Sequence, residues 1–183
     1  MKINGLLAFV MCAAFGSGIA QANVINGGFE TGDFTGWTLS GNTGFTGVST
    51  NSPQSGAYAA YLGAVSTLDY LSQNVSTVAG TAYTLGYWLE SDGGTPNEFS
   101  VSWDGTVLSD LHDIGSQRYT HYVFDVVATG ASSLLTFGSR DDPGFLHLDS
   151  VSVNSVLPEP ASLALFGIGL AGLGAMRRNG KKS

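Results

Sequence analysis

The chain has 183 residues and a formal net charge of −7, and its charged side chains are unevenly distributed. Five of the seven lysines and arginines lie in the terminal segments 1–22 and 157–183. Residues 23–156 therefore carry only two arginines against thirteen acids, a formal charge of −11. Nucleic-acid binding needs Lys and Arg to displace counterions from phosphates, so this composition excludes nucleic acid as a partner. Neutral sugars, divalent cations and basic surfaces stay compatible with it.

The first 22 residues have the pattern of a secretory signal peptide. Lys2 precedes an apolar stretch at 5–19, and Ala20-Gln21-Ala22 forms a small-x-small cleavage pattern. We therefore expect a signal helix over 1–22, export through the Sec translocon, and a mature chain that begins at Asn23. The single cysteine, Cys12, lies in this segment, so the mature chain has no thiol and no disulfide.

Residues 23–156 have the pattern of one all-β domain, a β-sandwich. Short alternating runs recur between turn signals, and no stretch before Pro158 has helical periodicity. Asp104-Gly105 is a hairpin turn of the kind that supplies positive φ. Strands are expected at 83–89, 99–103, 107–108, 122–126, 135–137 and 151–153.

The order of several short motifs resembles the galactose-binding-like jelly roll of carbohydrate-binding modules and related bacterial surface domains. The resemblance covers most of residues 23–154 and implies a single jelly-roll β-sandwich. The motifs that carry it are Asn26-Gly27-Gly28-Phe29-Glu30, Gly36-Trp37, Ser55-Gly56-Ala57-Tyr58-Ala59-Ala60, Leu71-Ser72-Gln73-Asn74-Val75, Ala79-Gly80-Thr81-Ala82-Tyr83-Thr84-Leu85, Leu135-Thr136-Phe137 and His147-Leu148-Asp149-Ser150-Val151-Ser152-Val153.

This resemblance also implies a metal site. In many such jelly rolls a structural calcium, which takes six to eight oxygen ligands, ties the first strand to the last. The matching positions are Glu30 and Asp149, although Ser150 stands where a second aspartate is frequent. The alternative is that both carboxylates only cap turns at the sheet edge.

Sugar recognition needs flat aromatic faces and a few placed polar groups. If Tyr83, Leu85, Tyr87 and Leu89 face the core, Trp88 and Glu90 point outward from the same strand. The same argument places His121 and Asp125 on the outside of the next long strand. We expect these four outward residues to bind ligand, with packing of Trp88 as the alternative. Trp37 is expected in the core, and Trp103 is expected to pack on its hairpin.

Catalysis is not expected. The histidines at 112, 121 and 147 lack paired ligand spacing, and no Gly-x-Ser-x-Gly elbow is present. Among thirteen acidic side chains, some pair will lie by chance at the separation that the two catalytic carboxyl groups of a glycosidase have. A carboxylate pair alone therefore does not indicate a glycosidase. Two interpretations then compete: a carbohydrate-binding module, and a structural or adhesive protein that uses the fold as a spacer.

The C-terminal segment 157–183 resembles a PEP-CTERM sorting signal, which in that family is cut by an exosortase of exopolysaccharide-producing Gram-negative bacteria. Pro158-Glu159-Pro160 is followed by sixteen uncharged residues at 161–176 and then by Arg177-Arg178. A helix of that length spans about 24 Å, less than the roughly 30 Å hydrocarbon layer. We expect a short hydrophobic helix that anchors the chain briefly in the inner membrane before exosortase processing. A permanent anchor and a buried helix are the alternatives.

After processing, the expected location is the cell surface or extracellular matrix, with extracellular polysaccharide as the partner. The apolar run and the basic tail thus serve delivery, and the acidic β-domain is the part of the mature product that acts outside the cell.

Overall fold

Ten strands make up almost all of the regular structure in the computed structural model, which describes residues 23–142 and 144–156. No helix in these residues is both long and apolar enough to span a bilayer. In chain order the elements are β1 (Thr38–Gly41), η1 (Thr43–Phe45), β2 (Thr46–Ser49), β3 (Ala59–Leu62), β4 (Asp69–Ser76), β5 (Ala82–Ser91), β6 (Asn97–Trp103), β7 (Thr106–His112), β8 (Gln117–Val127), β9 (Ser132–Asp141) and β10 (Leu146–Ser155).

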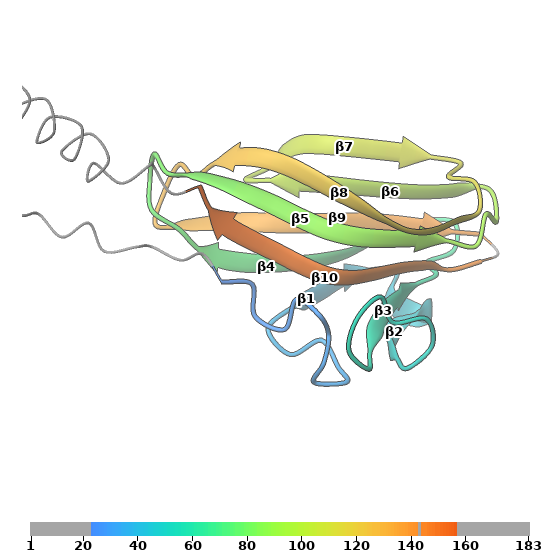
Figure 1. The fold of residues 1–183 in the computed structure, drawn as a ribbon. Coiled ribbons are helices and arrows are strands. Elements are labelled where there is room, and N and C mark those ends of the chain that lie inside the picture. The colour runs from blue at the N-terminus through green and yellow to red at the C-terminus, as the bar shows by residue number, and fades with distance from the viewer. Residues whose placement is uncertain (1–22, 143, 157–183) are drawn as a thin grey trace, which may run out of the picture.

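The strands form two antiparallel five-stranded sheets that pack face to face (Figure 1). The front sheet has the order β2-β3-β10-β5-β8, and the back sheet has the order β1-β4-β9-β6-β7. Neighbours in each sheet are mostly far apart in sequence; β10, for example, pairs with both β3 and β5. The predicted all-β sandwich is confirmed.

The core lies between the two sheets and is rich in aromatic rings. Tyr83, Leu85, Tyr87 and Leu89 of β5 are all fully buried, as their alternation predicts. Phe137 of β9 meets Tyr87 edge to face at 5.2 Å between ring centroids, so an aromatic contact joins the two sheets. The ring of Phe137 also contacts Phe99 at 5.7 Å and Trp37 at 6.1 Å.

Trp37, which was expected in the core, is 8 % exposed, and Trp103, which was expected to pack on its hairpin, is 4 % exposed. Trp103 ends β6, directly before the Asp104-Gly105 turn. The positive φ values of 49° at Asp104 and 79° at Gly105 confirm the predicted hairpin geometry.

The four strands β1 to β4 were not among the strands predicted from alternation. β1 and β2 are short and rich in Gly, Ser and Thr, and β3 has only four residues. β4 places the polar side chains of Asp69 and Gln73 at inward positions, where they are 2 % and 5 % exposed. The described chain begins and ends at the same end of the sandwich (Figure 1). The predicted signal helix and the predicted C-terminal helix lie outside the described residues.

We predict that Phe137→Ala lowers the free energy of unfolding by about 3–5 kcal/mol, because it removes the ring that three other aromatic side chains contact. Urea denaturation of residues 23–156 measures the change. Val107→Ala is the control, since Val107 is 62 % exposed and should change stability by no more than about 0.5 kcal/mol. Equal effects of the two substitutions would contradict this account of the core.

Candidate functional site

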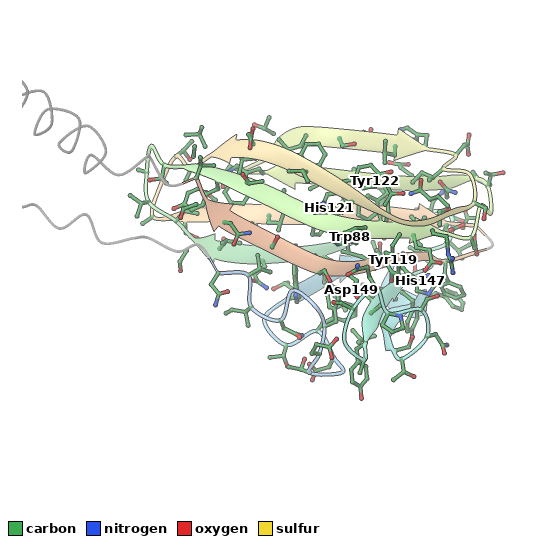
Figure 2. All side chains as sticks on the ribbon, viewed as in Figure 1. Trp88, Tyr119, His121, Tyr122, His147 and Asp149 are labelled. Carbon is green, nitrogen blue, oxygen red and sulfur yellow. The ribbon has the colours of Figure 1, made fainter. Side chains whose placement is uncertain are left out.

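The outer face of the front sheet brings together most of the side chains that were expected to bind ligand. Trp88 and Glu90 alternate with buried neighbours on β5 and so point outward, as predicted, but both are half-buried rather than exposed. His121 of β8 and His147 of β10 flank them on the two adjacent strands. We call this group, together with Tyr119, the Trp88 face (Figure 2).

Trp88 and His121 are direct cross-strand partners, and their rings stack. The ring centroids lie 4.7 Å apart and the planes differ by 15°. Gly86 makes room for this stack, because a Cβ there would lie 3.1 Å from His121 Nε2. The stack holds the indole in one orientation against the imidazole ring.

Glu90 of β5 and His147 of β10 are also direct cross-strand partners; Glu90 lies two residues after Trp88 on the same strand. Glu90 Oε2 and His147 Nδ1 are buried, and neither has a hydrogen-bond partner in the part of the chain that the structure describes. Burial lowers the pKa of His147, although the charges of Glu90 and Asp92 act in the opposite direction. An unpaired buried polar atom costs about 1–3 kcal/mol, so a group that reached either atom and formed a hydrogen bond with it would recover part of that cost.

Tyr119 belongs to the same face but was not predicted from the sequence. A register shift between β5 and β8 lies next to it, and its hydroxyl donates a 2.6 Å hydrogen bond to the carbonyl oxygen of Ser52. Burial raises the pKa of Tyr119, and the charges of Asp149 and Glu90 raise it further. The phenol is therefore protonated at neutral pH and connects the face to the loop between β2 and β3.

Asp125 lies apart from the other predicted ligand residues. It pairs across the strands with Thr84, whereas the Trp88–His121 pair lies four residues away along β8. The exposed carboxylate accepts a 3.3 Å hydrogen bond from Thr84 Oγ1. The structure thus brings Trp88, Glu90 and His121 together and leaves Asp125 at the far end of the same sheet face.

Glu30 and Asp149 converge on the loop between β2 and β3, residues 50–58. Asp149 is fully buried, and its Oδ2 accepts the backbone N–H groups of Gln54 at 2.8 Å and Ser55 at 3.1 Å. The Glu30 carboxylate accepts the N–H groups of Ala57 and Tyr58 at 3.0–3.2 Å. The two predicted metal ligands therefore hold one loop from opposite ends of the sequence.

Burial raises the pKa of Asp149, and the nearby negative charge of Glu30 raises it further, while three backbone N–H groups lower it. Asp149 Oδ2 and Glu30 Oε1 each already accept two N–H groups, whereas Asp149 Oδ1 and Glu30 Oε2 accept one each and keep a lone pair that could bind a calcium ion. The N–H groups already stabilise part of the charge, so the carboxylates also have the turn-capping role that was the alternative.

Two further features of the surface lie away from the Trp88 face. Glu98, Asp110 and His112 each place one ligand atom within 4.8 Å of the others on the β6–β7 hairpin. The His112 side chain is 59 % exposed, and its ring nitrogens lie 3.3 Å from Asp110 and 3.8 Å from Glu98, so this cluster is an exposed group of side chains that contact one another.

An open depression of about 590 Å³ lies beside the β1–β4 edge of the back sheet. Tyr70, which is 39 % exposed, and Arg140 contribute its largest side chains. Arg140 is engaged by Asp142 at 3.2 Å. This depression offers a second surface on which an exposed aromatic ring could meet a ligand.

Comparison with protein-family models matches the PEP-CTERM protein-sorting motif over residues 156–178. The chain carries a PEP-CTERM sorting motif. The matched range includes all five residues expected in the signal, namely Pro158, Glu159, Pro160, Arg177 and Arg178, which lie outside the described residues. The motif indicates an exported protein that an exosortase processes. No curated protein matches the chain at a significant level.

Solved structures with similar folds include several carbohydrate-binding modules. TmCBM61, solved with β-1,4-galactotriose, has a TM-score of 0.60 and 20 % identity over 73 % of this chain and 98 % of its own. The CBM22-1 xylan-binding domain of Paenibacillus barcinonensis Xyn10C has a TM-score of 0.55 and 19 % identity over 78 % of this chain and 99 % of its own.

The enzymatically active domain of bacteriophage CBA120 tailspike protein 4 is also similar, with a TM-score of 0.57 and 14 % identity over 73 % of this chain but only 21 % of its own. At these identities the likeness concerns the fold alone. The PEP-CTERM chain thus has the jelly-roll fold of carbohydrate-binding modules, as the order of its motifs implied.

Proposed function

We propose that the mature protein is a non-catalytic carbohydrate-binding protein that associates with extracellular polysaccharide through the Trp88 face. The observation that carries the proposal is the combination of a stacked, half-buried indole with two buried polar atoms, on Glu90 and His147, that have no partner among the described residues. An indole face packs against sugar C–H groups, and hydroxyls bond to such polar atoms. The fold shared with carbohydrate-binding modules supports the same conclusion.

Charge favours a neutral polysaccharide as the ligand. Residues 23–156 have a formal charge of −11, and Glu90 lies on the proposed contact surface. A glycan with carboxylate or sulfate groups would meet repulsion from this domain, whereas hydroxyl groups would not. Within the neutral class, the polysaccharide that the producing cell exports is the first candidate.

The carboxylates near Trp88 support binding without hydrolysis. A glycosidase needs two carboxyl groups on opposite sides of the scissile bond. Glu90 supplies one, but the nearby Asp149 is fully buried and accepts hydrogen bonds from the loop backbone. Asp149 therefore has a structural role, and the face presents a single carboxylate to a glycan.

We further propose that Glu30 and Asp149 bind one structural calcium ion. The ion would connect the first segment of the domain, the last strand and the loop at 50–58. Because this loop also accepts the Tyr119 hydrogen bond, the calcium would stabilise the border of the Trp88 face.

We predict that Trp88→Ala weakens retention on the bound polysaccharide at least tenfold, which corresponds to about 1.4 kcal/mol or more, while the fold is kept. A glycan array with residues 23–156, followed by affinity electrophoresis on each positive polysaccharide, measures the change. His121→Ala should have a smaller effect in the same direction, because it removes only the ring that orients the indole.

The matched control is Tyr70→Ala, which removes a partly exposed aromatic ring from the other sheet. Its binding should equal that of the wild type. Loss of binding in the Tyr70 variant with retention in the Trp88 variant would move the site to the back-sheet depression. Absence of binding to every polysaccharide would favour the structural or adhesive role.

We predict that removing calcium with a chelator lowers the melting temperature of the wild type more than that of Glu30→Gln. A ligand present at a hundred times its Kd stabilises the native state by about 2.7 kcal/mol. Differential scanning calorimetry with and without added calcium checks this. Identical chelator-induced shifts in the wild type and the variant would exclude a calcium ion at Glu30.

We predict that the protein recovered from the surface or medium of the producing cell lacks the segment from Ala161 to the C-terminus, because exosortase cleavage separates the sorting signal from the domain. Intact-mass measurement gives the answer directly. A surface-released product that still contains Met176 would show that the segment is a lasting anchor.

A further inference from the structure

Two carboxylates meet at the end of the sandwich where β5 and β9 finish, opposite to the end where the described chain begins and ends (Figure 1). Asp92 follows the last residue of β5 in the front sheet, and Asp141 is the last residue of β9 in the back sheet. A Cβ at Gly94 would lie 3.2 Å from Asp92 Oδ1 and 3.3 Å from Asp141 Oδ1. One oxygen of each carboxylate therefore borders the same small region of space.

Asp141 is a buried carboxylate with unused acceptor capacity. Its side chain is 0 % exposed, and Oδ1 accepts one hydrogen bond, from Gly144 N at 3.2 Å. Oδ2 has no hydrogen-bond partner among the described residues. Burial, followed by the negative charge of Asp92, raises the pKa of Asp141 to about 6, so this position is unfavourable for an unpaired negative charge.

Asp69 shows how the same chain stabilises another buried carboxylate near this end. Asp69 is 2 % exposed and accepts hydrogen bonds from the hydroxyls of Ser139 and Thr46. Every oxygen of Asp69 thus has a donor in the protein. Asp141 differs because one of its oxygens does not, and the nearest ionisable group is another acid.

Asp92 is held rigidly beside Asp141 by the backbone of two loops. Its Oδ1 accepts Gly94 N at 2.7 Å, and its Oδ2 accepts Phe145 N at 2.9 Å. A Cβ at Gly144 would overlap Asp92 Oδ2, so only glycine lets the backbone pass so close to this carboxylate. Each Asp92 oxygen keeps a second lone pair for a further ligand.

We propose that Asp92 and Asp141 bind a calcium ion at this end of the sandwich, separate from the proposed ion at Glu30 and Asp149. The donors are carboxylate oxygens, which calcium prefers, and backbone carbonyls and water can complete its shell of six to eight oxygens. Affinities of extracellular calcium modules lie at about 10⁻⁴–10⁻³ M. An ion here joins the β5–β6 loop to the β9–β10 loop and so links the ends of the two sheets.

The competing explanation is that Asp141 is a neutral acid with no ion beside it. Asp141→Asn separates the two, because an amide has the shape of a protonated carboxyl group but cannot replace an anionic ligand. A neutral Asp141 predicts that this variant binds as much calcium as the wild type. A calcium-bound Asp141 predicts that it loses one ion.

The experiment is equilibrium dialysis of the full-length chain in detergent against calcium at about 10 mM, roughly tenfold above the weak end of the extracellular range. Bound calcium is counted by elemental analysis. We expect Asp141→Asn to bind one calcium ion fewer than the wild type. Asp92→Asn, at a more exposed position, should lower the affinity for the same ion at least tenfold. This variant replaces Asp141→Asn in the test if Asp141→Asn does not fold.

The matched control is Asp113→Asn, which removes one negative charge at the same end of the domain. Asp113 N bonds to the carbonyl oxygen of Asn97, and its φ of 50° suits asparagine equally well. This variant should bind as many ions as the wild type. Equal calcium in the wild type, Asp141→Asn and Asp92→Asn overturns the proposal.

Glu30→Gln separates this site from the other proposed ion. If only the site at Glu30 and Asp149 is wrong, Glu30→Gln binds like the wild type and Asp141→Asn still loses one ion. If only the site at Asp92 and Asp141 is wrong, the opposite pattern appears. Loss of one ion in each variant and of both in the double variant supports both sites.

Discussion

The packing of two five-stranded sheets through an aromatic core is the constraint on which the other features of this domain depend. Phe137 of the back sheet contacts Tyr87 of the front sheet and also Phe99 and Trp37. Residues 23–156 contain no cysteine that could cross-link them, so this packing is a main source of stability. Because inward positions of the strands are used for the core, ligand chemistry is restricted to the outer faces and the end loops.

That restriction explains which parts of the fold the sequence predicted. Apolar and polar residues alternate clearly in a strand that has one apolar face and one polar face, as in β5. From this alternation both the strand and the outward direction of Trp88 could be predicted. Asp104-Gly105 is as clear, since a two-residue hairpin needs the positive φ values that these residues adopt. In such segments local sequence and tertiary packing agree.

Strand β4 could not be predicted from alternation because polar residues, Asp69 and Gln73, occupy two of its inward positions. Gln73 lies inside and exchanges hydrogen bonds with the backbone of Ile25, at 2.7 Å to its N–H and 2.9 Å to its carbonyl oxygen. The side chain thus acts as a strand partner for the entering chain, 48 residues earlier. No periodic pattern encodes that role, because it depends on a contact that exists only in the folded chain.

The same limit applies to the candidate site. The alternation of side-chain directions along β5 placed Trp88 and Glu90 correctly on the outer face. Which residues lie beside them depends on how β5 is paired with its neighbouring strands. The stack on His121 and the pairing of Glu90 with His147 follow from which strands are adjacent, and Tyr119 reaches Ser52 across 67 residues of sequence. The order of motifs singled out Glu30 and Asp149, yet only the structure shows that both hold the loop at 50–58.

The domain also contains three buried carboxylates whose surroundings differ. Hydroxyl groups stabilise Asp69, backbone N–H groups stabilise Asp149, and Asp141 has one oxygen with no donor among the described residues. None of the three pairs with arginine, because residues 23–156 contain only two, and Arg140 is engaged by Asp142. A domain with a formal charge of −11 and so few cations of its own gains more from bound calcium than a balanced one would. In a domain that has neither disulfides nor lysines, a cation bound at the proposed sites would therefore act as a cross-link.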